Sequence, residues 1–174
     1  VLFPGYSRVA GDPDAFKWHY LQSVGALVYL TLPAAVGIIA VAAPLVSVLL
    51  GAQWAAAAPV VAILALRGAL LSLSLNDYAV YMAKGRPAIV LYLKLPYVTL
   101  LLVLLFVLTP VYGVVGAAAA FVVADIVLLP VFFLVRFRIV GISLNEFVTA
   151  VGRSVVGATA MFFVVSGFIR WSSD

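Results

Sequence analysis

Long, nearly uncharged stretches of apolar residues dominate this chain of 174 residues. An α-helix needs about 20 such residues to cross a bilayer, and about five stretches reach that length. Hydrophobic residues make up 67% of the chain and charged residues only 9%. A soluble domain is usually about a quarter charged, so this chain could not cover a water-facing surface. The pattern predicts an all-α integral membrane protein, a bundle of about five transmembrane helices.

The predicted bundle occupies residues 21–170 and divides at short turns. Asp12 and Pro13 are typical of a helix start, as N-cap and first helical residue, and Pro33 should kink the first span because it lacks an N–H. An interfacial segment, residues 1–20, precedes the bundle, and a short tail, residues 171–174, follows it. We expect spans at residues 21–46, 57–82, 88–108, 114–135 and 147–169.

Positive charges gather on one side of this arrangement. Loops 1–20, 83–87 and 136–146 hold all the loop cations except Arg170. Because Lys and Arg are retained on the cytoplasmic side, these three loops are predicted to be cytoplasmic. The aromatic residues then mark the two membrane interfaces: Trp54, Tyr112 and Trp171 outside, Trp18 and Tyr20 inside.

Arg67 lies near the middle of the second span, where a charge is costly in hydrocarbon. At 100° per residue, Ser74, Tyr78 and Tyr81 fall within about 40° of its direction, and Asp77 about 80° away. This stripe predicts either a water-filled cavity in which Arg67 meets an anionic head group, or an ion pair buried between helices. Asp77 is a candidate for ion coupling or for that pair.

Asp125 lies near the middle of the fourth span among apolar neighbours, so it needs a partner from another helix. Arg67, at similar depth, is the expected partner, and the open alternatives are charge neutralisation or coupling of a cation or proton. Lys94 either extends to the membrane interface or lies on a substrate path, and the same alternatives apply to Arg153.

The sequence carries no pattern typical of an enzyme, a metal site or a cofactor site. There is no cysteine and only one histidine, His19, which we interpret as an ordinary interfacial residue. Asp12 and Asp14 fit a turn and a cap better than a metal–phosphate site. The net charge of +4 is explained by loop topology, so no nucleic-acid partner is expected.

Several short segments resemble, in their order and spacing, the Wzx-type oligosaccharide flippases of the multidrug/oligosaccharidyl-lipid/polysaccharide exporter superfamily. The resemblance extends from Leu2 to about Arg153. The segments that carry it are Leu2-Phe3-Pro4-Gly5-Tyr6-Ser7-Arg8, Gly11-Asp12-Pro13-Asp14, Leu32-Pro33-Ala34-Ala35-Val36-Gly37, Leu49-Leu50-Gly51-Ala52-Gln53-Trp54, Ile63-Leu64-Ala65-Leu66 and Lys84-Gly85-Arg86-Pro87.

The resemblance implies a protein of about twelve to fourteen helices in two lobes around a central cavity, of which this chain would form part of the second lobe. It implies transfer of polyprenyl-pyrophosphate-linked oligosaccharide across the bacterial inner membrane, with membrane lipids and a missing N-terminal lobe of the same polypeptide as partners. The cavity would be cationic, which suits Arg67 and Lys94. The chain begins at Val1 rather than Met, so we expect a piece of a longer protein.

Other functions stay open at this stage. A cation-coupled multidrug antiporter of the same superfamily would share the two lobes, but its cavity should be richer in carboxylates. A membrane glycosyltransferase or polysaccharide polymerase would carry long outer loops or acidic cytoplasmic motifs, which this chain lacks. A non-catalytic scaffold or an inactive product is the remaining alternative.

Overall fold

The computed structural model describes residues 6, 9 and 11–173, with side chains as far as residue 163. The described residues form helices and no strand, which confirms the all-α fold of a membrane protein. The helices are α2 (Pro13–Ala40), α3 (Ala42–Leu49), the 3-10 helix η1 (Ala52–Ala57), α4 (Ala58–Ser72), α5 (Asp77–Ala83), α6 (Ala88–Val140) and α7 (Leu144–Ser173).

The first helix begins where the sequence predicts and ends earlier than expected. The carboxylate of Asp12 accepts hydrogen bonds from the backbone N–H groups of Asp14 and Ala15, at 3.0 and 3.1 Å. These bonds satisfy donors that a helix start leaves unpaired. α2 runs without interruption through Pro33. It stops at Ala40, because Pro44 crowds the carbonyl four residues before it, so the predicted first span consists of α2 and α3.

The second predicted span is also divided, between α4 and α5. The hydroxyls of Ser72 and Ser74 donate to the carbonyls of Ala69 and Leu71. Side chains that bond to nearby backbone in this way compete with regular helix hydrogen bonds, and residues 73–76 form turns instead. The interruption changes the direction in which every later side chain of this span points.

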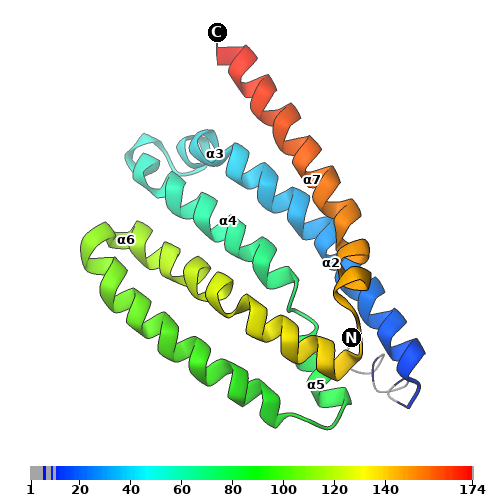
Figure 1. The fold of residues 1–174 in the computed structure, drawn as a ribbon. Helices are drawn as coiled ribbons and strands as arrows, with labels where there is room; N and C mark the ends of the chain where they lie inside the picture. Colours follow the sequence, from blue (N-terminus) through cyan, green and yellow to red (C-terminus); the bar gives the residue numbers. More distant parts are fainter. Residues whose placement is uncertain (1–5, 7–8, 10, 174) are drawn as a thin grey trace.

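α6 contains both the third and the fourth predicted spans. Its 53 residues would extend about 80 Å if straight, against a hydrocarbon core of about 30 Å. Gly113, with φ 58° and ψ −138°, interrupts it, and Figure 1 shows the two arms of α6 doubling back on each other. The reversal falls within the predicted turn, residues 109–113. We call residues 88–112 the first arm and residues 114–140 the second arm.

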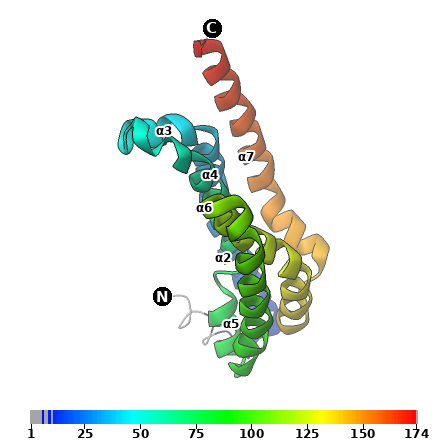
Figure 2. The same cartoon turned by 90° about the vertical axis from the view of Figure 1, so that its left-hand side faces the viewer.

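The helices lie side by side in the order α7, α2, α4 and α6 (Figure 1), and the view turned by 90° shows how thin this layer is, with α7 leaning away (Figure 2). Three segments among the described residues are long and apolar enough to cross a membrane: Pro13–Ala40, Ala52–Ala83 and Ala88–Val140. Large apolar side chains remain exposed along them, such as Phe106 at 84%. Such surfaces suit lipid rather than water.

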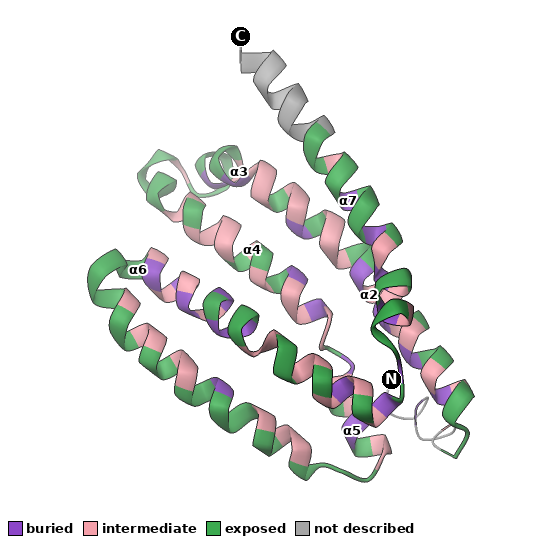
Figure 3. Cartoon of the chain, viewed as in Figure 1, coloured by how far each residue is buried: buried purple, intermediate pink, exposed green. Residues whose placement is uncertain are grey.

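The main core lies at one end of the layer, where α2, α5, the end of α6 and the start of α7 meet (Figure 3). Phe16, Tyr20, Tyr81 and Phe147 are buried there. The three basic loops of the sequence converge at this end: Lys84 lies 4.1 Å from the ring of Phe16. The described parts of these loops thus share one side. That this side faces the cytoplasm stays a prediction. The division of the chain into an interfacial segment, a bundle and a tail, at residues 1–20, 21–170 and 171–174, also stays a prediction.

The start of α7 is held by a capping box. Glu146 accepts hydrogen bonds from the backbone N–H and the hydroxyl of Ser143, both at 2.8 Å, and forms an ion pair with Lys17 of α2. The bond from Lys17, followed by those from Ser143, lowers the pKa of Glu146 to about 2. Two helices far apart in the sequence are joined there. Arg8 and the side chains of Arg170 and Trp171, to which the sequence assigned loop positions, lie outside the described residues.

Candidate functional site

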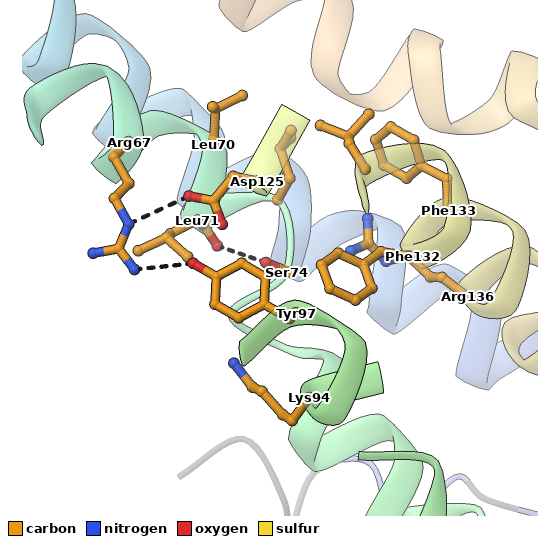
Figure 4. A pocket seen from close by; sticks show the side chains of 12 residues that line it. Arg67, Leu70, Leu71, Ser74, Lys94, Tyr97, Asp125, Phe132, Phe133 and Arg136 are labelled. Carbon is orange, nitrogen blue, oxygen red and sulfur yellow. Dashed lines mark hydrogen bonds and ion pairs between the residues drawn. The ribbon is translucent and has the colours of Figure 1, made fainter. Parts of the chain in front are cut away.

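Arg67 of α4 joins both arms of α6. Its Nε donates to Oδ2 of Asp125 on the second arm at 3.3 Å, and its Nη2 donates to the hydroxyl of Tyr97 on the first arm at 3.4 Å (Figure 4). The guanidinium lies 4.2 Å from the centre of the Phe121 ring. The structure thus forms the predicted Arg67–Asp125 pair, with one long hydrogen bond between the two side chains and part of the arginine exposed.

A second and tighter ion pair lies nearby, between α5 and the end of α6. Nε and Nη2 of Arg136 donate to the two carboxylate oxygens of Asp77 at 2.9 and 2.7 Å. Arg136 is only 1% exposed and lies 5.0 Å from the Phe133 ring and 5.9 Å from the Phe147 ring. Asp77 therefore forms an ion pair with Arg136 rather than with Arg67, and its role in ion coupling stays a prediction.

Arg136 is the residue that the sequence interpretation misplaced. The sequence predicts that Arg136 lies in the cytoplasmic loop 136–146, which is wrong because α6 continues to Val140 and buries this side chain. A helical signal was available, since Phe133, Arg136, Phe137 and Val140 recur at intervals of three and four residues on one face. Its positive charge favoured the loop assignment instead.

The continuous polar stripe predicted on the second span does not form, because the turns at residues 73–76 separate α4 from α5. Ser74 stays on the side of Arg67, where both line a small cavity. Tyr78 is 62% exposed and Tyr81 only 2% exposed. The hydroxyl of Tyr81 is buried in the core, so Tyr81 and Tyr78 do not lie together on one polar stripe as predicted.

Two adjacent cavities lie between α4, α5 and the two arms of α6. The smaller, about 90 Å³, is bounded by both ion-pair arginines, Tyr97 and Asp125. The larger, about 280 Å³, is bounded by Asp77, Tyr78 and Tyr81. They share four lining residues, Leu71, Ser74, Lys94 and Phe132, and Figure 4 shows Lys94 below Tyr97 at the edge of the smaller one.

Of the cations that line the two cavities, Lys94 is the one without a carboxylate partner among the described residues. Asp125 is paired with Arg67, and Asp77 with Arg136. Lys94 is exposed and makes no ion pair with any described residue; its nearest aromatic neighbour is Tyr97, with Nζ 5.3 Å from the ring centre. An uncompensated ammonium between two cavities attracts anions.

Several buried polar atoms around the Asp77–Arg136 pair make no hydrogen bond to other described residues. They are the hydroxyls of Tyr6, Tyr20 and Tyr81, the side-chain amide of Asn76 and Nη1 of Arg136. Buried polar groups are normally paired with protein or with ordered water. This region of the core is thus suited to internal water.

The remaining sequence candidates lie apart from the cavities. His19 is exposed and packs edge-on against Trp18, with ring centres 4.9 Å apart. Arg153 is exposed on α7. In the described part of the chain, no group of three or more His, Cys, Asp or Glu residues could hold a metal ion.

Residues 1–59 match a family described as polysaccharide biosynthesis protein. These residues include most of the segments that carry the sequence resemblance. The resemblance to polysaccharide-biosynthesis membrane proteins is confirmed.

A curated relative extends the similarity beyond the matched third of the chain. It is an "Uncharacterized membrane protein in cps region" of Klebsiella pneumoniae, 25% identical over 138 residues. The alignment covers 78% of this chain, and the chain spans 28% of the length of that relative. No solved structure matches the chain.

Proposed function

We propose that the protein containing this chain moves polyprenyl-pyrophosphate-linked oligosaccharide across the bacterial inner membrane and is not itself an enzyme. The observation that carries the proposal is Lys94, a cation that lines both cavities at the junction of three helices and forms no ion pair with a described residue. A pyrophosphate carries several negative charges and binds such a cation without displacing an existing ion pair. The match of residues 1–59 to polysaccharide-biosynthesis proteins supports a glycan-bearing substrate.

In this mechanism the pyrophosphate enters the smaller cavity and meets Lys94 first. Arg67 lies beside it, and its bonds to Asp125 and Tyr97 are long, at 3.3 and 3.4 Å. Arg67 can therefore turn toward the anion at small cost. The polyprenyl chain stays in lipid beside the exposed apolar face of α6, and a second lobe of the same polypeptide closes the cavity from the other side.

The alternative of a cation-coupled drug antiporter is less well supported. Its cavity should present free carboxylates, whereas both carboxylates that line these cavities are bound to arginine. Asp77 and Asp125 are therefore poorly placed to bind a cationic drug.

The test is Lys94→Gln in the full-length protein, reconstituted in vesicles that contain a labelled lipid-linked oligosaccharide. Transfer is measured by the accessibility of the glycan to an added glycosidase. Loss of one charge-assisted contact should slow transfer about tenfold or more, and Lys94→Arg should retain most of it. The matched control is Arg153→Gln, which removes an exposed cation away from the cavities. Unchanged transfer in Lys94→Gln would contradict the proposal.

A further inference from the structure

The larger cavity is the less cationic of the two: among the described residues it is lined by Lys94 alone of the Lys and Arg side chains, whereas Arg67 and Arg136 also line the smaller one. Its walls carry three aromatic side chains, Tyr78, Tyr81 and Phe132, together with the polar atoms of Ser74 and Asp77. Drug-sized ligands need cavities of about 300–1,000 Å³, so a volume of about 280 Å³ suits a single ring rather than a whole oligosaccharide.

Aromatic walls with a few polar groups match a sugar ring. One face of a pyranose presents C–H groups, which pack against an aromatic ring, and its edge presents hydroxyls that need acceptors and donors. The Tyr78 side chain is 62% exposed and available for such packing. The aromatic group is rigid, so little conformational entropy is lost when it is covered.

Asp77 can accept a hydroxyl without losing its ion pair. Its two oxygens each receive one hydrogen bond from Arg136, whereas an ionised carboxylate has about four acceptor positions. Asp77 lines the larger cavity, so the remaining positions are available there. The paired arginine holds the carboxylate in one orientation, which fixes the direction of the acceptor.

The two cavities are joined in the order that the substrate requires. Lys94 and Ser74 line both of them, so a pyrophosphate at Lys94 places its covalently attached sugar at the mouth of the larger cavity. We propose that the larger cavity binds the first sugar ring of the lipid-linked glycan, with the ring packed on Tyr78 and a hydroxyl donating to Asp77. This inference rests on the proposed function and adds a site that selects the sugar next to the phosphate.

The experiment compares two probes on the purified full-length protein in lipid nanodiscs. One is a polyprenyl pyrophosphate, and the other is the same lipid bearing a single N-acetylhexosamine. The measured quantity is the ratio of their dissociation constants, and the change in this ratio from wild type to variant reports the contact with the sugar, because the extra terminal phosphate charge of the bare lipid is the same in both measurements. Tyr78→Leu should reduce the advantage of the sugar-bearing probe about three- to tenfold and leave binding of the bare lipid unchanged, and Tyr78→Phe should retain most of the advantage.

The matched control is Tyr92→Leu, since Tyr92 is 71% exposed on α6 and lines neither cavity. Lys94→Gln should weaken both probes equally. If Lys94→Gln weakens both while Tyr78→Leu leaves the ratio unchanged, the sugar site is wrong and the proposed function stands. If Lys94→Gln affects neither probe, the proposed function fails and the sugar site fails with it. A wild-type protein that binds both probes equally would also overturn the sugar site.

Discussion

The two ion pairs illustrate how burial decides what a charged residue does. Arg67 and Asp125 share one long hydrogen bond, and about a quarter of the arginine side chain is exposed. Arg136 and Asp77 share two short bonds, and the arginine is almost fully enclosed. The first pair can open at small cost, whereas the second holds α5 against the end of α6.

We expect single substitutions in the buried pair to destabilise the protein strongly. Asp77→Asn leaves the buried Arg136 charge uncompensated, and breaking such a pair costs about 3–5 kcal/mol. The double variant Asp77→Leu with Arg136→Met should lose much less, because no charge is then left unpaired. Thermal unfolding of the full-length protein in detergent measures both. The control is Asp125→Asn at the more exposed pair, for which we expect the smaller loss; equal losses at the two pairs would contradict this account.

At the scale of elements, glycine determines how α6 reverses. Gly113 has a positive φ and a ψ of −138°, a combination that essentially only glycine adopts. A Cβ on Gly116 would meet the carbonyl of Leu108 across the turn. The two arms can therefore approach closely only with glycine at both positions.

Gly113→Ala should cost about 1–3 kcal/mol of stability through backbone strain. Gly68→Ala is the matched control, because Gly68 is helical and a Cβ there meets nothing within 4 Å; it should stabilise slightly, by about 0.5–1 kcal/mol. Thermal unfolding in detergent compares the two variants. Equal stability of both would show that the reversal does not depend on the glycine conformation.

The Lys17–Glu146 contact ties α2 to α7 and should respond to pH. The pKa of Glu146 is lowered from 4.5 to about 2, so its folded-state interactions favour the charged form. Their contribution to stability is complete above pH 4.5 and disappears as the pH falls toward 2. Glu146→Gln should remove this part of the acid dependence. The measurement is the thermal unfolding temperature of the wild type and of the variant at several pH values between 5 and 2. If the unfolding temperature of the variant fell with pH as steeply as that of the wild type, the link would be refuted.

At the scale of the whole molecule, the exposed apolar surface and the clustered basic loops define an orientation in the bilayer. α5, followed by Lys84, and the start of α7, with Glu146, lie at the end that holds the main core, whereas α3, followed by η1 with Trp54, and the reversal of α6 next to Tyr112 lie at the other end (Figure 1). Positive charge retained in the cytoplasm would place the core end inside.

This chain contains no cysteine, so a single cysteine introduced into it reports the orientation directly in a full-length protein whose other cysteines are replaced. A membrane-impermeant thiol reagent on intact cells should label Gln53→Cys, in the connection after α3, and should not label Ser143→Cys, between α6 and α7. Both residues are exposed, so accessibility in lysed cells serves as the control for each. Labelling of Ser143→Cys in intact cells would invert the topology.

Local signals in the sequence determined the membrane character, the all-α fold, the Asp12 cap and the reversal near Gly113, because each depends on residues close together in the chain. Similar depth along two apolar stretches indicated Arg67 as the candidate partner of Asp125, and the structure brings the two side chains together. Only the tertiary structure decided that Tyr78 is exposed while Tyr81 is buried, and that Arg136 is buried against Asp77, 59 residues away. Such contacts depend on how separate helices pack, and hydropathy read along one chain carries no information about packing between helices.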